Sequence, residues 1–475
     1  STRYVLVTNW LSILKLRTLS VITENTVSNA LTIAKFGGTS VANYAAMQNC
    51  AKIVAGNPAT RIVVVSAAAG VTNYLVSLAH TPMTQEQIND TVQSIIDIEL
   101  AILNALKDKA NIEPKLNELL DELRSLASHE EILHRNDLKD QLLSMGERMS
   151  SLMFSAVLAE QNVQTLNFDV RRVLRTDSEF GEAAPQIDAI AENAQKLLKP
   201  EIANAIVVTQ GFVGADEEGR TTTLGRGGSD FTAALLAEGL EADVCEIWTD
   251  VTGVYTTDPR ITPAAHPLPE LSFEEAAEMA TFGAKVLHPA TMEPAVRKDI
   301  KVFVGSSKEP EKGGTWIVRD CEHEPSFRAI TRRKEQVMVT VKTPKMMYAQ
   351  GFLQQVFAII AKHKLSVDLV TTSEISVSFT LDNPANSVAQ RLNRETIAEL
   401  ETICDVKVEH GFDLVTVVGN HMQTGKGVSS RIFAAVSDYN LRMICFGANP
   451  HNISFLVNKS DSTEIVKVLH SELFE

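Results

Sequence analysis

Short runs of apolar, often β-branched residues alternate with helix-length segments from about residue 31 to residue 305. The runs occur at 61–68, 163–168, 205–212, 245–250 and 301–306. Between them, apolar positions recur with helical periodicity and few breakers at 85–108, 113–127 and 137–160. Strands that alternate with helices in this way predict a largely parallel sheet covered by helices on both faces.

The last third of the chain contains an internal repeat. The segment that begins at Gly351 aligns with the segment that begins at Gly427, 76 residues further on. The alignment continues without a gap to Phe379, which matches Phe455. Each copy predicts the order strand, helix, strand, strand, helix, strand, at the size of a ferredoxin-like unit. We therefore expect a paired module, distinct from the α/β part, from about residue 321 onward.

Composition and charge exclude several classes of protein. The chain has 475 residues, of which 44% are apolar and 22% are charged, as expected for a globular protein of two to four domains. Its formal net charge of -15 argues against binding to nucleic acids or anionic membranes, because both need a basic surface. The five cysteines are scattered without a CxxC pair, which favours a reducing, cytoplasmic setting over a disulfide framework or a zinc site.

The N-terminal segment and the apolar runs give no clear sign of a membrane or of export. No apolar run reaches the roughly 18 residues that a membrane span requires. The first 23 residues lack acids and carry Arg3, Lys15 and Arg17, which faintly resembles a targeting segment. Polar residues interrupt the apolar stretch, and no cleavage pattern follows. We treat residues 1–30 as an extension of unknown role.

The sequence AKFGGTSVA marks a first candidate anion site. Lys35 lies in a predicted buried strand, and Gly37 and Gly38 at its exit would let a ligand approach the backbone closely. Amides there, and at the start of a helix that we place at Thr39 and Ser40, could hold phosphate oxygens beside the lysine. An ordinary strand-to-helix turn with a surface lysine is the alternative.

A second glycine-rich stretch, GRGGSD, precedes an evident helix. Three glycines surround Arg226, and Ser229 and Asp230 stand at the helix entry. A serine or aspartate at this position is most often only an N-cap. An arginine between glycines is harder to explain by structure alone. Neither glycine stretch has the GxxxxGK[ST] spacing of a Walker A loop.

Two further stretches follow predicted strands. In IWTDVTGVYTTDPR, a strand ends at Thr249 and Asp250, and a turn presents Tyr255 and Arg260. In FGAKVLHPATMEPAV, Lys285 stands just before a predicted helix. A turn-rich connector is the alternative interpretation of the first stretch.

Together these blocks resemble the aspartate kinases of the amino-acid kinase superfamily. The matching blocks are KFGGTSV, VTNYL, SMGERMSS, GRGGSDFTAALLA, WTDVTGVYTTDPR and FGAKVLHPA, and the repeat is similar to the paired ACT domains of that family. The resemblance covers residues 31–475. It implies an α/β amino-acid kinase fold over 31–320, with a parallel-rich sheet between helices, and two ferredoxin-like βαββαβ ACT domains over 321–475.

The implied activity is phosphoryl transfer from ATP to the β-carboxylate of L-aspartate, the first step of the lysine, threonine and methionine pathway. A carboxylate is already an anionic nucleophile at pH 7, so no general base is needed. Catalysis should rest on positioning and on charge neutralisation by Lys, Arg and Mg²⁺. We expect ATP to hold most of the Mg²⁺ coordination and predict no protein metal site.

The resemblance also assigns roles to individual residues. Lys35 and Asp230 would be catalytic, with Asp230 orienting the lysine at the phosphates. L-Aspartate would be bound by Thr72, Glu147, Arg226 and Ser229. The nucleotide would be bound by Lys35, Phe36, Gly37, Gly38, Thr249, Asp250, Tyr255, Arg260, Lys285 and Val286.

Within the family, the chain is most similar to the monofunctional, lysine-sensitive type. This implies L-lysine as an allosteric inhibitor, bound to the first ACT unit. Free amides at a helix start would hold its carboxylate, and Asp368 and Glu374 would receive its ammonium groups. The implied lysine site consists of Met346, Gly351, Phe352, Leu353, Ser366, Val367, Asp368, Thr372, Ser373 and Glu374. Tyr348 departs from an expected histidine.

ACT units commonly associate edge to edge, so we expect this lysine site at a subunit interface of a homodimer or a dimer of dimers. Other readings remain open. The chain could be a non-catalytic amino-acid sensor, a threonine-sensitive aspartate kinase, or a related kinase acting on glutamate or carbamate. The intact charged residues of the glycine loops argue against the sensor.

Overall fold

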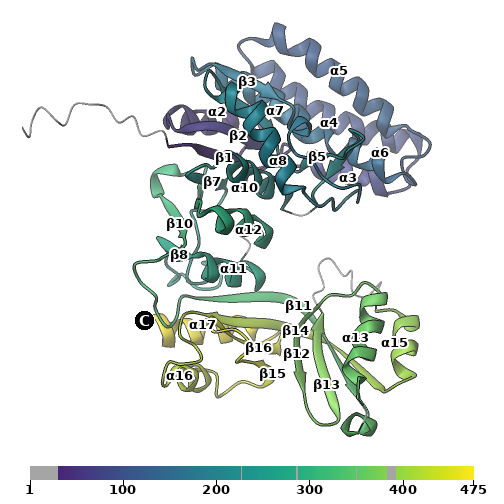
Figure 1. The fold of residues 1–475 in the computed structure, drawn as a ribbon, viewed down its shortest axis with the longest axis vertical. Coiled ribbons are helices and arrows are strands. Elements are labelled where there is room, and N and C mark those ends of the chain that lie inside the picture. The colour runs from purple at the N-terminus through teal and green to yellow at the C-terminus, as the bar shows by residue number, and fades with distance from the viewer. Residues whose placement is uncertain (1–29, 226, 285–286, 349, 382–391) are drawn as a thin grey trace, which may run out of the picture.

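The molecule has two parts, each built around its own large β-sheet (Figure 1). The computed structural model describes residues 30–225, 227–284, 287–348, 350–381 and 392–475. The first part is a mixed α/β unit, and the second is built on an antiparallel sheet. Throughout these ranges, no helix is long and apolar enough to cross a membrane.

The sheet of the first part is largely parallel, as predicted. Among the described residues it has eight strands in the order β3-β4-β2-β1-β7-β9-β10-β8. The strands from β3 to β9 in this order run parallel to their neighbours, whereas β10 is antiparallel to β9. The strands are β1 (Thr32–Phe36), β2 (Thr60–Val65), β3 (Thr165–Phe168), β4 (Ile206–Gln210), β7 (Val244–Thr249), β8 (Glu270–Ser272), β9 (Lys301–Ser306) and β10 (Gly314–Val318). A separate hairpin joins β5 (Val213–Ala215) to β6 (Thr221–Thr223).

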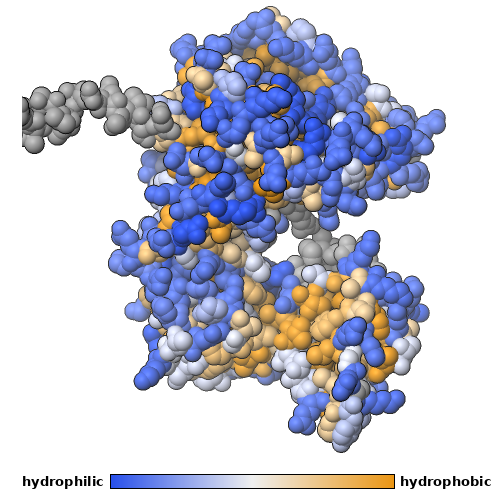
Figure 2. Space-filling model, viewed as in Figure 1, coloured by the Kyte–Doolittle hydropathy of each residue, from blue (hydrophilic) through white to orange (hydrophobic). Residues whose placement is uncertain are grey.

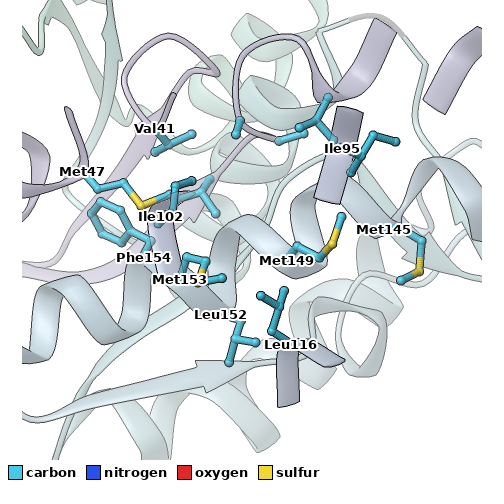
Figure 3. Close-up of a cluster of buried hydrophobic side chains, with 14 of the residues drawn as sticks. Val41, Met47, Ile95, Ile102, Leu116, Met145, Met149, Leu152, Met153 and Phe154 are labelled. Carbon is cyan, nitrogen blue, oxygen red and sulfur yellow. The ribbon is translucent and has the colours of Figure 1, made fainter. Parts of the chain in front are cut away.

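Helices cover both faces of this sheet because the central strands are apolar on both sides. Ile33 of β1 belongs to the core beneath α10, whereas Ala34 and Phe36 belong to the core beneath α2 and α7. Figure 3 shows the second core, where Met149, Met153 and Phe154 of α7 meet side chains from several other helices. The helices of this part are α2 (Tyr44–Ala55), α3 (Val71–His80), α4 (Gln85–Ala105), α5 (Lys109–Ala127), α6 (Asn136–Leu143), α7 (Met145–Ala159), α8 (Ile187–Asn193), α9 (Lys199–Ile202), α10 (Gly228–Leu240), α11 (Phe273–Thr281) and α12 (Pro289–Lys298).

Two of the predicted helix boundaries differ from the structure. The single helix expected over 137–160 is interrupted at Ser144, which ends α6 and caps α7. The helix expected to start at Thr39 and Ser40 begins only at Tyr44. Turn hydrogen bonds occupy the earlier residues, and the side chain of Asn43 caps α2 by accepting a bond from the Ala46 amide.

The second part is a single antiparallel sheet made by both repeat units. Its described strands lie in the order β12-β13-β11-β14-β16-β15. The repeat predicted from the sequence is confirmed, but in the second copy the strand expected after the last helix is replaced by the N-terminal half of β11. Gly351 and Gly427 each lie directly before a helix, and both glycines have a left-handed backbone conformation, with φ of 83° and 79°. Phe379 and Phe455 are both fully buried. The elements are β11 (Ala329–Lys342), α13 (Phe352–Lys362), β12 (Val367–Thr372), β13 (Ser376–Leu381), α15 (Arg394–Glu401), β14 (Asp405–Val418), α16 (Val428–Ala435), β15 (Leu441–Cys445), β16 (Asn452–Asn458) and α17 (Ser462–Phe474).

The first repeat unit is inserted into the second. The C-terminal half of β11, from Met338 to Lys342, pairs with the first half of β14 in the first unit. The N-terminal half of β11, from Ala329 to Arg333, instead pairs with residues 414–418 of β14. The second unit therefore takes one strand from before the first unit and its other elements from after it. We refer to residues 337–409 as the first regulatory unit and to residues 329–333 with 412–474 as the second.

The second regulatory unit is the one that contacts the α/β part. Glu275 of α11 is buried and is paired with Arg328, at 2.8 Å, and with Asn420. Glu278 of the same helix accepts hydrogen bonds from Asn449 and Asn452. Acidic side chains of α11 thus connect the α/β part to the residue before β11 and to two further segments of the second unit.

Candidate active site

The predicted phosphate and substrate residues lie at the carboxyl edge of the parallel sheet. The chain leaves β1 towards β2 on one side, whereas β7 lies on the other side of β1. In doubly wound sheets, ligands bind at such a switch point, because the two outgoing loops diverge there and leave a crevice.

Lys35 and Asp230 form an ion pair at the centre of this edge. The Lys35 Nζ lies 2.7 Å from the Asp230 Oδ1, and the two side chains are only 11% and 15% exposed. Asp230 is in the first turn of α10, where the helix dipole favours a negative charge. The N-cap of α10 is Gly227, with φ 71°, so neither Ser229 nor Asp230 caps the helix. The Asp230 carboxylate is therefore available to hold the lysine.

Glu147 lies near this pair in the first turn of α7. It is 5% exposed, and burial raises the pKa of its carboxyl to about 8. Hydrogen bonds from backbone amides, including that of Ala67, and the charge of Lys35 act in the opposite direction. Gly146 permits this arrangement, since a Cβ there would lie 2.6 Å from the Cβ of Ala67. The result is a buried acid whose charged form would be favoured by a cationic ligand.

The loop after β1 offers fewer free amides than the sequence suggested. The Gly37 amide already donates to the carbonyl of Trp248, at 3.2 Å. The Gly38 carbonyl accepts from the Ala69 amide, at 3.1 Å, which ties this loop to the one after β2. Because α2 starts later than expected, its free amides also lie further along the chain. The positive charge beside this loop comes from Lys35, which lies in β1 itself.

The second glycine stretch follows the β5–β6 hairpin. Thr223 ends β6, and its amide donates to Asp140 of α6 at 2.8 Å. The same Asp140 oxygen accepts from the Gly181 amide at 2.9 Å. These bonds hold the two segments that border the stretch from Gly225 to Gly228. Arg226 itself lies outside the described residues.

The predicted nucleotide residues fall on the loops after β7 and before α12. Thr249 ends β7, and its carbonyl accepts from the Ser307 amide at 2.9 Å. The hydroxyl of Tyr255 lies 2.6 Å from the Thr252 Oγ1. The guanidinium of Arg260 is 84% exposed and is paired with Asp258 at 2.7 Å. Lys285 and Val286 lie outside the described residues.

Sequence reasoning missed two contacts that shape this edge. Ser40 and Ser307 are buried, and their hydroxyls lie 2.6 Å apart, which joins the loops after β1 and β9. Asp140 was missed because it looks like any other acid of an amphipathic helix. Its burial, at 1% exposure, distinguishes it, and no spacing in the sequence reveals that burial.

Six of the ten predicted lysine-site residues form two groups at opposite ends of β12, and the other four lie before or at the start of α13. Ser366, Val367 and Asp368 are at the start of β12, and Thr372, Ser373 and Glu374 are at its end. The loop containing Met346 leaves β11 beside the second group, since the Thr343 amide donates to the Ile375 carbonyl. An extended chain rises about 3.3 Å per residue, so Asp368 and Glu374 are about 20 Å apart. Over such a span, one lysine is too short to contact both acids of the same subunit.

The two acids also differ in their surroundings. Asp368 is partly buried and lies 3.4 Å from the Nη1 of Arg333 on β11. Glu374 is exposed at the β12–β13 turn. Gly351 is the N-cap of α13, followed by the buried Phe352 and by Leu353, which is 40% exposed.

An apolar area covers part of the first regulatory unit on the face shown in Figure 2, in the region of β12, β13 and α13. Large apolar side chains that are exposed in this unit include Val370 on β12, 41% exposed, and Met347 before α13, 50% exposed. β12 is an edge strand, and edge strands with exposed apolar side chains are ready to pair with another chain.

Family models match both parts of the chain. Residues 30–306 match the amino acid kinase family, and residues 415–473 match the ACT domain. The second match falls on the second regulatory unit.

Named relatives match over almost the whole length. The chain is 47% identical to the lysine-sensitive aspartokinase 3 of Escherichia coli over 447 residues, which cover 94% of this chain and 99% of that protein. The crystal structure of E. coli aspartokinase III with aspartate and ADP, in the R-state, superposes with a TM-score of 0.85, covering 94% of this chain and 100% of that chain at 47% identity. The same enzyme with lysine and aspartate, in the T-state, gives a TM-score of 0.81 at 48% identity, with the same coverage.

Proposed function

The chain belongs to the aspartokinases of the amino acid kinase family, and from this we propose that it transfers the γ-phosphoryl group of ATP to the β-carboxylate of L-aspartate. The product would be 4-phospho-L-aspartate, which begins the route to lysine, threonine and methionine. The relative crystallised with aspartate and ADP supports this pair of substrates.

The observation that carries the proposal is the Lys35–Asp230 ion pair with buried Glu147 nearby. Phosphoryl transfer between two anions needs a fixed positive charge where the phosphate charge redistributes. Lys35, held at 2.7 Å by Asp230, supplies that charge from the end of β1. Glu147 would receive the α-ammonium of aspartate, and Arg226 would bind a substrate carboxylate through its planar guanidinium. Thr72, at the start of α3, and Ser229 would complete the aspartate site.

Mg²⁺ would reach the site with ATP. Magnesium in kinases is usually held by substrate phosphates, waters and only one or two carboxylates. The described ranges contain no group of three or more His, Cys, Asp and Glu side chains that could hold a metal ion. A cation coordinated mainly by the nucleotide would neutralise the phosphates.

We further propose that L-lysine inhibits the enzyme at the first regulatory unit and that the subunits pair there. The relative crystallised with lysine supports the choice of effector, and the edge strand β12 with its exposed Val370 supports the pairing. In a two-fold pairing of β12 edges, the start of one strand would meet the end of its partner. A homodimer, or a dimer of such dimers, would then assemble each lysine site from two subunits.

An assay of aspartate-dependent ADP release, with hydroxylamine to trap the acyl phosphate, tests the proposed activity. Glutamate and carbamate in place of aspartate distinguish the related kinases, and lysine against threonine distinguishes the regulatory types. A protein that binds amino acids but releases no ADP would instead be a sensor.

Lys35→Ala tests the role of the ion pair. We expect kcat to fall by at least about 100-fold, with a smaller change in the KM for aspartate, because the lost charge matters most in the transition state. Lys298→Ala is the matched control, since Lys298 lies at the end of α12 and is paired only loosely with Glu241, at 3.6 Å. A near-normal kcat for Lys35→Ala would refute the assignment.

A further inference from the structure

The loop between β7 and β8 runs from the nucleotide edge to the regulatory region. It begins after Thr249 and doubles back, so that the Thr256 amide donates to the His266 carbonyl at 3.0 Å. Tyr255, the predicted nucleotide contact, lies within this doubled stretch. The loop is therefore one piece of structure with a nucleotide end and a regulatory end.

Thr256 is the point at which the regulatory region holds this loop. It is 1% exposed. Its carbonyl accepts from the Ile330 amide of β11 at 2.7 Å. Its hydroxyl accepts from the His266 amide at 3.1 Å and lies 2.9 Å from the Nε2 of His470 in α17. Both Ile330 and His470 belong to the second regulatory unit, so this unit contacts the residue directly after Tyr255.

His470 is held firmly for this contact. It is 1% exposed, its ring stacks on Phe474 with a centroid distance of 4.9 Å, and it meets the edge of His266 at 6.1 Å. Burial lowers the pKa of its imidazole, so the ring is neutral near pH 7 and suited to a hydrogen bond with a hydroxyl. Ile261, further along the loop, packs against the core of the second unit.

We propose that His470, a residue of the regulatory region, is a positioning residue for nucleotide binding, which it serves by fixing Thr256 and thereby the loop that presents Tyr255. The inference rests on the proposed function, because it takes Tyr255 as a nucleotide contact. A long loop that is ordered in advance loses less conformational entropy when ATP binds. His470 has no proposed contact with substrate and acts on the loop through Thr256 and the ring of His266.

The test compares His470→Leu, which fills the space without a polar atom, with His470→Gln, which can still reach the hydroxyl. We expect His470→Leu to raise the KM for ATP and the Kd for ADP about three- to tenfold, the effect of one lost hydrogen bond. The KM for aspartate should hardly change. His470→Gln should restore most of the nucleotide affinity.

Val466→Ala is the matched control, because Val466 is buried in the same helix but lies in the core of the second unit. It should lower the melting temperature without changing the ADP Kd. An equal loss of ADP affinity in Val466→Ala, or normal affinity in folded His470→Leu, would overturn the inference.

A second route tests the same bond from the loop. Thr256→Val removes the bond to His470 and also the bond from the His266 amide, so it should weaken ADP binding at least as much as His470→Leu does. The double variant should bind ADP no more weakly than Thr256→Val, because the Thr256–His470 bond is then already absent. Thr256→Val also serves if His470→Leu does not fold. If the wild-type protein neither binds ADP nor releases it from ATP with aspartate, the proposed function fails instead, and the two outcomes are distinct.

Discussion

Glu147 is buried, yet its proposed role requires a charge. Its pKa is raised to about 8 by burial, so in the free protein at pH 7 most copies are protonated. An ammonium group placed beside it would favour the carboxylate and lower that pKa. Binding of aspartate should therefore release a proton from the enzyme.

The first prediction concerns the pH dependence of aspartate binding. Only the ionised form of Glu147 can receive the ammonium group, and its fraction rises about tenfold per pH unit until the pKa is reached. The KM for aspartate should fall as the pH rises from 6 towards 8. Steady-state kinetics over this range, with the ATP concentration saturating, provide the measurement.

Glu147→Gln is the control for this pH prediction. It removes the titrating group, so the variant should bind aspartate weakly and with little pH dependence below pH 8. An unchanged slope in Glu147→Gln would show that another group controls the profile.

At the scale of elements, α6 positions the second glycine stretch through one side chain. Asp140 is buried, and its Oδ2 accepts from the amides of Thr223 and Gly181. Removing it leaves two amides without their acceptor. We predict that Asp140→Ala raises the KM for aspartate about tenfold and the KM for ATP much less, because the stretch leads to Arg226 and Ser229.

Asp137→Ala is the matched control on the same helix. Asp137 is paired with Arg135 at the surface, so its loss should leave both KM values unchanged. Equal increases in both KM values for Asp140→Ala would indicate general loosening of the fold instead. Melting temperatures of the two variants separate these cases.

The elements themselves were largely predictable from the sequence, and the exceptions have physical causes. The strands and the long helices α4 and α5 follow from periodicity, since both faces of the sheet are buried. The predicted start of α2 was wrong because Ser40 is held by turn hydrogen bonds and by Ser307, which is 267 residues away. The insertion of one regulatory unit into the other was not predictable, because both halves of β11 are equally strand-like. Which partner each half takes depends on the whole sheet.

Only those residues of the candidate site that lie within recognisable sequence motifs could be predicted. Lys35 and Asp230 lie in long signature blocks, and the structure brings them together. His470 lies in an ordinary amphipathic helix, and nothing local marks it. The roles of all the candidate site residues stay predictions, and Arg226, Lys285 and Val286 also lie outside the described residues.

At the scale of the whole molecule, the edge strand β12 should control both assembly and regulation. Val370→Asp places a charge in the apolar edge, where Val370 is 41% exposed. We predict that this variant is monomeric, retains its kcat and is no longer inhibited by lysine, because on our proposal each lysine site is assembled from two subunits. Light scattering and lysine titration provide the measurements.

The matched control is Val296→Asp, at a valine of α12 with 39% exposure. It should leave both assembly and inhibition unchanged. A dimeric Val370→Asp enzyme with normal lysine inhibition would contradict the proposed pairing.

Asp368→Ala tests the lysine site without placing a new charge on the apolar part of β12. It should keep its activity and its oligomeric state but lose lysine inhibition. If threonine inhibits instead, or if the variant stays fully sensitive to lysine, the lysine site has been misassigned although the kinase assignment would stand.

The insertion of the first regulatory unit into the second also fixes an order of assembly on the ribosome. The first unit can close once residue 409 has been made, since Met338 pairs with Glu409. The second unit cannot fold at that stage. Ala329 pairs with Val418, and the core of this unit includes side chains of α17, which are made later. On our proposal the loop carrying Tyr255 becomes ordered only when His470 of the same helix contacts Thr256. The catalytic part therefore reaches its final form last, although it is translated first. Each newly made copy would then acquire nucleotide binding and its regulatory apparatus together.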